Sequence, residues 1–224
     1  MRRIIVKIIN SIKWHAVVDV REMLNTLFSK RRRAGLAGDG FTIISNNCWA
    51  GHVYRYFGLP YNTPTIGLYI WPECYLQLLS DLKTYMGLPL TFIGWEESMH
   101  PDILQRRGET DKPIGRLGDV EIVFLHYESE EEVLGKWTRR VQRIDWNHIL
   151  VKCSQQNGMT WSQVEQFDRL PYDDKIIFVP ISTDTIKSAV WYKNSAGKDE
   201  VEDDILSFRK YVDLTSWING SYTK

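Results

Sequence analysis

The residues best suited to chemistry lie together in residues 45–52, which read SNNCWAGH. This segment follows an apolar strand-like run and leads into a helix, so it lies at the carboxyl end of a strand, where open α/β sheets bind ligands. Asn46 and Asn47 offer hydrogen-bond donors and acceptors, which suits a hydroxyl-rich substrate. Cys48 at a helix start is a candidate nucleophile with a lowered pKa. His52, four residues later, shares its helical face and is a candidate base.

The same residues also have structural explanations. Asn46 and Asn47 can cap the helix that follows, and Cys48 can be a small buried apolar side chain. Trp49 can belong to the core, or its ring can stack on a sugar. The junction therefore favours a ligand site without fixing which residue reacts.

A second candidate segment is the loop 58–65, GLPYNTPT. Its two prolines make it stiff, and Tyr61 and Asn62 can reach a polar ligand. As a rigid loop beside the first segment it can form one wall of a pocket. The alternative is a well-defined turn with no further role.

A third segment, residues 115–121, predicts a turn leading into a strand over 120–127. Arg116 can bind phosphate or carboxylate. Asp119 can orient a histidine, act as a base or hold a divalent metal, or it can simply be a solvated turn residue. His126 is either a base or a structural histidine. No phosphate loop, HExxH motif, nucleophile elbow or CxxC pair is present, so no residue is assigned to a metal and no cofactor is identified.

The elements that must position these residues alternate between strands and helices, which predicts an α/β fold with a mostly parallel or mixed sheet flanked by helices. An amphipathic helix with a basic end is predicted at the N-terminus, within a segment 1–39, followed by a single α/β domain over 40–224. Residues 96–114 are predicted to be an irregular excursion. The predicted strands cover 41–45, 65–70, 90–95, 120–127, 149–153, 175–181 and 189–192, and the predicted helices begin near 72, 129, 160 and 203.

Composition excludes several classes of protein. Lysines plus arginines number 28 and aspartates plus glutamates also 28, and this balance argues against a dedicated nucleic-acid binder. The three widely spaced cysteines suit a reducing cytoplasm. No apolar run is long enough for a membrane span. The basic N-terminal helix either contacts the inner membrane peripherally or docks on its own domain.

Several motifs resemble those of a bacterial family catalogued as domain of unknown function nineteen-nineteen. The resemblance covers roughly residues 40–181 and rests on residues 44–51, 58–64, 113–121, 124–127, 136–140 with Arg143, and 167–172. The resemblance implies a setting in capsule or exopolysaccharide biosynthesis, because such proteins are typically encoded among those genes.

Three functions are compatible with this setting. In the first, an acyl group passes to a glycan precursor, with Cys48 or a substrate hydroxyl as nucleophile, and His52 or His126 as base. In the second, a glycosyltransferase uses a nucleotide sugar, and Arg116 meets its diphosphate. In the third, the protein binds glycan or acts as a scaffold without catalysis. The expected partners are a glycan precursor or an activated donor.

Overall fold

The computed structural model of the protein describes residues 27–220 and residue 222. The helix predicted over residues 1–33 is therefore tested only at its end, where residues 27–33 are helical. The rest of that prediction lies outside the described residues. Within the described part of the chain, no helix is both long enough and apolar enough to cross a membrane.

The first of two sheets is parallel and buried on both faces. Its four strands pair in the order β1 (Thr42–Ser45), β6 (Ile149–Ser154), β7 (Lys175–Val179) and β8 (Ala189–Trp191). Alternate residues of these strands enter two different hydrophobic clusters, one on each face. Burial on both faces explains why the strand sequences are nearly continuous apolar runs.

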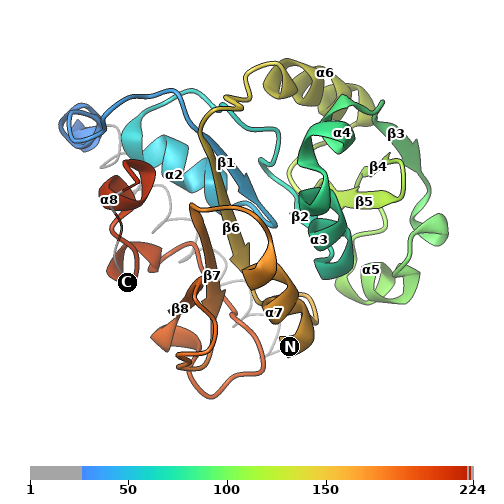
Figure 1. Ribbon diagram of the computed structural model, residues 1–224. Coiled ribbons are helices and arrows are strands. Elements are labelled where there is room, and N and C mark those ends of the chain that lie inside the picture. Colours follow the sequence, from blue (N-terminus) through green and yellow to red (C-terminus); the bar gives the residue numbers. More distant parts are fainter. Residues whose placement is uncertain (1–26, 221, 223–224) are drawn as a thin grey trace, which may run out of the picture.

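Four helices cover this sheet. One face packs against α2 (Trp49–Phe57) and α8 (Leu214–Ile218), and the other against α3 (Pro72–Ser80) and α7 (Trp161–Arg169). Helix α7 begins with a capping box, since Thr160 accepts from the backbone N–H of Gln163 and the Gln163 side chain accepts from the N–H of Thr160. Figure 1 shows α2 and α3 on opposite sides of the strands.

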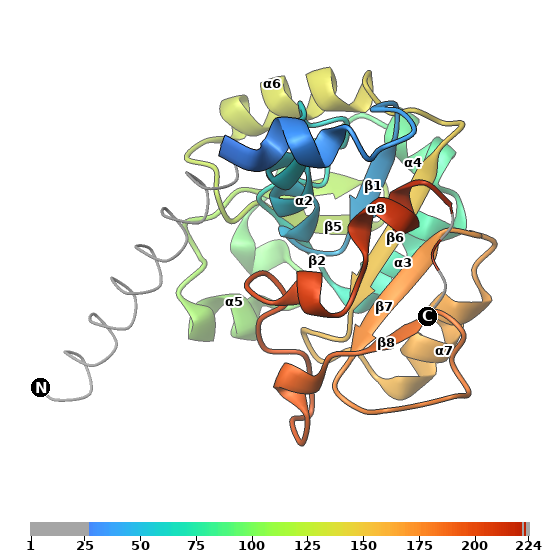
Figure 2. The same cartoon turned by 90° about the vertical axis from the view of Figure 1, so that its left-hand side faces the viewer.

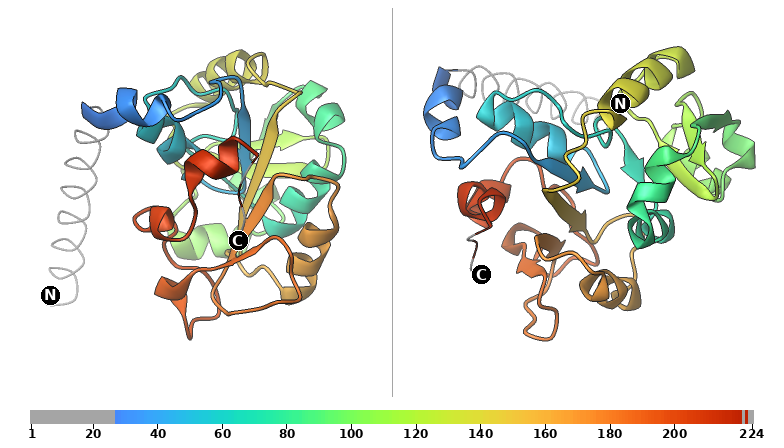
Figure 3. Two further views of the ribbon diagram at one scale, coloured as in Figure 1. Left: turned by 60° about the vertical axis from the view of Figure 1, so that its left-hand side comes forward. Right: turned by 45° about the horizontal axis from the view of Figure 1, so that its top comes forward.

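The second sheet is antiparallel. Its four strands pair in the order β2 (Tyr69–Ile70), β5 (Val120–Val123), β4 (Ile114–Leu117) and β3 (Thr91–Ile93). It shares the cluster containing α3, so this helix joins the two sheets. The remaining helices near it are α4 (Leu82–Gly87), α5 (Pro101–Arg107) and α6 (Glu130–Val141). Figures 1 and 3 show the antiparallel sheet to one side of the parallel sheet.

The α/β fold class is confirmed, while several predicted boundaries are wrong. The predicted helix from residue 72 to 86 is two helices, because Asp81 interrupts it and caps α4 through the N–H of Thr84. The predicted irregular excursion contains α5 and the short 3-10 helix Trp95–Glu97. Residues 115–117 belong to a strand, and the turn is confined to Gly118 and Asp119.

The C-terminal part departs most from expectation. The helix predicted to begin near residue 203 is reduced to the 3-10 helix Phe208–Lys210, and residues 200–207 have no regular structure. A second short 3-10 helix, Lys193–Ser195, follows β8. The strand predicted over 120–127 stops at Val123, which leaves His126 in a loop.

Tyr75 of α3 connects the helix to the parallel sheet. Its hydroxyl group is fully buried and lies 3.0 Å from the carbonyl oxygen of Ile44 and 2.9 Å from that of Lys152, on β1 and β6. A single donor thus links the two strands just before they reach the edge where the first candidate segment begins.

We predict that Tyr75→Phe lowers the free energy of unfolding by about 1–3 kcal/mol, because two buried carbonyls lose this donor while the ring shape is kept. Urea unfolding measures the change. Tyr85→Phe is the matched control, since its hydroxyl bonds to exposed Asp119. Equal effects of the two substitutions would contradict this role for Tyr75.

Candidate functional site

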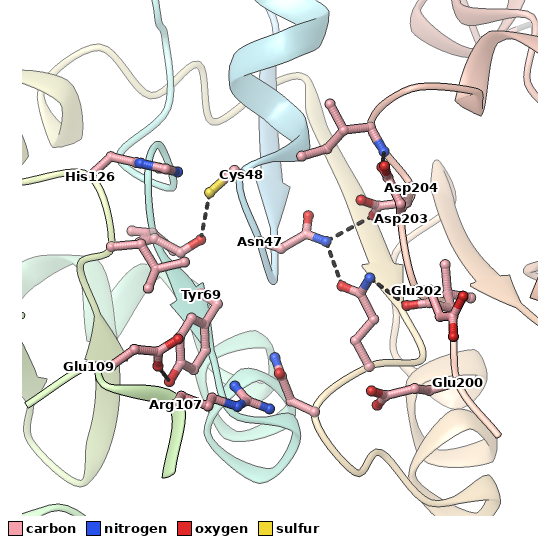
Figure 4. A pocket seen from close by; sticks show the side chains of 16 residues that line it. Asn47, Cys48, Tyr69, Arg107, Glu109, His126, Glu200, Glu202, Asp203 and Asp204 are labelled. Atoms are coloured by element: carbon pink, nitrogen blue, oxygen red, sulfur yellow. Dashed lines mark hydrogen bonds between the residues drawn. The ribbon is translucent and has the colours of Figure 1, made fainter. Parts of the chain in front are cut away.

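A cavity of about 410 Å³ opens at the carboxyl ends of β1 and β6. Three walls enclose it, and Figure 4 shows their side chains facing one another. Asn47 and Cys48 come from the β1–α2 junction, and residues 200–205 face them. The third wall carries side chains from near β2, from the end of α5 and from the loop after β5: Leu68, Tyr69, Arg107, Glu109, Leu125 and His126.

A buried ion pair lies beneath the cavity. The ammonium group of Lys152 on β6 is fully buried and pairs with the carboxylate of Asp204. Asp204 also accepts hydrogen bonds from Ser154 Oγ at 2.6 Å and from Asn47 Nδ2 at 2.8 Å. Lys152 additionally donates to Asn47 Oδ1 at 3.1 Å. The network joins β1, β6 and the segment 200–205, so it fixes one cavity wall to the sheet.

The charges of this pair depend on each other. Burial alone raises the pKa of Asp204, but the Lys152 ammonium and the hydrogen bonds from Asn47 and Ser154 outweigh burial and hold that pKa below its usual value. Burial lowers the pKa of Lys152, and the Asp204 carboxylate opposes that shift. Asp204 is therefore ionised at neutral pH.

Asn46 was predicted to bind substrate, and it instead joins two strand ends. Its Nδ2 donates to the carbonyl oxygen of Ser154 at 2.9 Å, and its Oδ1 accepts from the N–H of Ser154 at 3.0 Å. Its side chain is buried. Asn47, in contrast, lines the cavity and donates to Gln156 Oε1 at 2.8 Å.

Cys48 lines the cavity but lacks the lowered pKa predicted from its position before a helix. Burial, reinforced by the charge of Asp204, raises the pKa of the thiol to about 11. Its sulfur contacts the carbonyl oxygen of Leu68 at 3.4 Å. The thiol is protonated at neutral pH, which makes it a poor nucleophile.

His126 lies at the mouth of the cavity, in the loop that follows β5, and its side chain is exposed. This loop is anchored because the His126 N–H donates to the carbonyl oxygen of Gly67 at 3.0 Å. Gly67 has φ of +69°, and a Cβ there would lie 3.3 Å from His126, so glycine suits this contact. Although this side chain is accessible to solvent, the surrounding protein partly desolvates it, and this desolvation, with the charges of Arg55 and Lys112, lowers the pKa of His126. The imidazole is neutral at pH 7.

Tyr69, Glu109 and Arg107 form a linked group on the same side. The Tyr69 hydroxyl donates to Glu109 at 2.8 Å. Burial, followed by this hydrogen bond, raises the pKa of Tyr69, so the phenol stays protonated. The Arg107 guanidinium lies 5.7 Å from the centre of the Tyr69 ring and 5.5 Å from that of Trp71.

The acidic wall was missed from sequence. Glu200, Glu202 and Asp203 line the cavity together with Asp204. These residues belong to a run of four acids within 200–204, and that run was the available signal. The helix predicted from about residue 203 includes only the last two acids of this run. In the structure Asp203 instead accepts hydrogen bonds from two backbone N–H groups of a turn, and the run lies at the cavity.

Four predicted site residues on or near α2 lie outside this cavity lining. Trp49 is fully buried in the core, and His52 contacts the guanidinium of Arg55 at 3.1 Å. Tyr61 packs edge-on to Tyr54, and Asn62 donates to the carbonyl oxygen of Asp39 at 3.4 Å. The loop 58–65 thus does not form the predicted wall.

Arg116 and Asp119 also lie elsewhere. Arg116 pairs at 2.8 Å with Glu121, which is fully buried. Asp119 is exposed and accepts from the Tyr85 hydroxyl at 2.6 Å. Neither lines the cavity, so the third segment serves the antiparallel sheet. Among the described residues, no group of three or more His, Cys, Asp or Glu side chains is arranged to hold a metal ion.

Two comparisons place the chain among related sequences. A family model described as a domain of unknown function (DUF1919) matches residues 19–219. A protein of Haemophilus influenzae, described as an uncharacterized protein, is 31% identical over 192 residues, which cover 82% of this chain and 86% of the relative.

We predict that Lys152→Met destabilises the protein by about 3–5 kcal/mol, because Asp204 then stays buried without its counter-charge. The double variant Lys152→Met/Asp204→Asn should recover part of this loss. Chemical denaturation gives both values. Lys136→Met, which removes a partly exposed pair with Glu132, is the matched control and should cost no more than about 1 kcal/mol.

The pH dependence adds a second readout. Because the pKa of Asp204 is depressed in the folded state, its stabilising contribution is present above its usual value of 3.8 and is lost as the pH falls further, through the folded pKa. That acid-side loss should shrink in the Lys152→Met/Asp204→Asn variant. An unchanged profile would mean that the pair does not govern acid stability.

Proposed function

The chain belongs to the DUF1919 family, and we propose from the geometry of its cavity that it transfers an acyl group to a hydroxyl of a glycan precursor. One observation carries the proposal: amides, carboxylates and a neutral histidine converge on a single cavity at the carboxyl ends of two parallel strands.

The lining suits a sugar. Gln156 and Asn157 offer donors and acceptors, and Glu200, Glu202 and Asp203 offer acceptors from the facing wall. Sugar hydroxyls both donate and accept, so they match such a lining. The volume of about 410 Å³ falls in the range of small-molecule sites.

His126 is the favoured base. In the proposed step, a neutral imidazole nitrogen of His126 accepts the hydroxyl proton as the sugar oxygen attacks the carbonyl carbon of an acyl thioester. A C–O bond forms, the C–S bond breaks, and the proton passes from His126 to the leaving thiolate. The products are an ester and a free thiol. Arg107, on the same wall, offers positive charge to an anionic part of the donor.

Direct attack by the substrate is favoured over an acyl-enzyme on Cys48. A thiol with a pKa of about 11 supplies little thiolate at neutral pH. His52, the other base considered, is held against Arg55 and does not line the cavity. Of the routes considered from sequence, the hydroxyl nucleophile with His126 therefore has the most support.

The acceptor class comes from the family resemblance, which implies capsule or exopolysaccharide biosynthesis. A cytoplasmic location is part of this proposal, since activated precursors are made there and the three cysteines are free. A non-catalytic glycan-binding protein would use the same lining. The glycosyltransferase alternative has less support, because Arg116 and Glu121 pair with each other away from the cavity.

We predict that His126→Gln lowers kcat/KM for acyl transfer by about 10²- to 10⁴-fold. Glutamine is polar and similar in size to histidine, but it has no basic nitrogen to accept the proton. In the wild type, kcat/KM should fall as the pH drops below the pKa of His126, which lies under 6.5. The variant should lose this dependence. Transfer from acetyl-coenzyme A to short glycans is the assay.

Cys48→Ser is the matched control, and it should keep transfer within about threefold of wild type because the thiol does not react. Loss of transfer in a folded Cys48→Ser protein would restore the covalent route. If the protein binds glycans but transfers no acyl group from any acyl thioester, the proposed acyl transfer is wrong and the protein is a glycan-binding protein.

A further inference from the structure

A second surface feature lies away from the cavity, on the helical residues 27–33. Leu27 and Phe28 are 69% and 50% exposed, which is unusual for large apolar side chains. Lys30, Arg31 and Arg33 are exposed on the same short helix. Apolar and basic side chains are thus both exposed on this short helix.

The basic surface continues onto a distant part of the chain. The guanidinium groups of Arg32 and Arg209 lie 4.1 Å and 5.1 Å from the centre of the Tyr56 ring. Arg209 and Lys210 are exposed, and with Tyr56 they line a second cavity of about 400 Å³. The carboxylate of Asp213, which also lines that cavity, accepts hydrogen bonds from two backbone N–H groups at the start of α8.

This surface is held in place by specific contacts. Arg32 donates to the carbonyl oxygen of Tyr56 at 3.2 Å, which joins the helical residues to α2. Asn219 donates to the carbonyl oxygen of Gly35 at 3.0 Å and accepts from the N–H of Ala37 at 2.9 Å. Figure 2 shows the helical residues 27–33 and α8 on the same side of the molecule.

The distribution of charge along the chain is uneven. The first 33 residues contain nine lysines and arginines and two acids, a net charge of +7. Since the whole chain is neutral, residues 34–224 carry −7. Within the described part of this segment, residues 27–33 contain four basic residues and no acid, beside the exposed Leu27 and Phe28.

We propose that residues 27–33, with Tyr56, Arg209 and Lys210, form a docking face for an anionic bilayer surface. Basic side chains attract anionic headgroups, and Leu27 and Phe28 insert at the acyl boundary. A nucleic acid would use the same charge but would not need the exposed leucine and phenylalanine. The docking face is independent of the proposed transferase activity.

The test is co-sedimentation of the full-length protein with vesicles. Vesicles of phosphatidylcholine with about 30 mol% phosphatidylglycerol should bind it at least about tenfold more strongly than pure phosphatidylcholine, and raised salt should weaken binding. Arg209→Glu/Lys210→Glu should abolish the preference for anionic vesicles. Leu27→Ser/Phe28→Ser should weaken binding at least about threefold with the charge unchanged.

The matched control is Lys83→Glu/Lys193→Glu, which makes the same charge change at exposed positions on α4 and the 3-10 helix 193–195. It should bind like wild type. Absence of a preference for anionic vesicles in the wild type overturns the proposal. An equal loss of vesicle binding in the two charge-reversal variants also overturns it. The proposal fails as well if the protein binds duplex DNA as strongly as anionic vesicles and Leu27→Ser/Phe28→Ser leaves that DNA binding unchanged.

Discussion

Burial of the Lys152 ammonium group is the constraint on which the site depends. A buried charge is tolerated only where a counter-charge and hydrogen bonds replace water. Here Asp204 and Asn47 supply them, and these two residues lie 157 positions apart in the chain. The segment 200–205 has no regular structure to hold it in place. Its attachment to the sheet comes largely from this ion pair and from hydrogen bonds of Gln155 and Gln156 with Val201.

The two sheets explain why the cavity forms at this edge. The parallel sheet brings the ends of β1 and β6 side by side, and the antiparallel sheet, joined through α3, brings Tyr69 and the loop carrying His126 to the opposite wall. Neither sheet alone encloses the space. Most side chains that line the cavity therefore come from loops, while buried strands set the distances between them.

The features of the fold that depend on local sequence patterns could be predicted. Strands β6 and β7, the start of helix α7 and the β1–α2 junction are all visible in the sequence as apolar runs and capping residues. The sequence does not reveal which polar side chains form hydrogen bonds or ion pairs within the protein and which face the cavity. Asn46 and Arg116 look like ligand-binding residues, yet each is bound within the protein. Asn46 bonds to Ser154, 108 positions away, and Arg116 pairs with buried Glu121 on the neighbouring strand.

The acidic wall was missed for a related reason. Residues 200–204 have no amphipathic period of their own, and their place is set by Lys152, some fifty residues earlier in the chain. The pKa of Cys48 was likewise misjudged, because the helix start favours a thiolate while burial and Asp204 oppose it more strongly. The position of residues 200–204 and the pKa of Cys48 both depend on burial in the folded protein, which local sequence patterns do not predict.

If the cavity holds a glycan and an acyl donor, both ligands should stabilise the folded protein. Thermal unfolding of the wild-type protein is therefore measured with short glycans, acyl thioesters and nucleotide sugars. A ligand at a hundred times its Kd adds about 2.7 kcal/mol of stability. We expect glycans and acyl thioesters each to raise the Tm. Stabilisation by nucleotide sugars with no response to either of these ligands would contradict it.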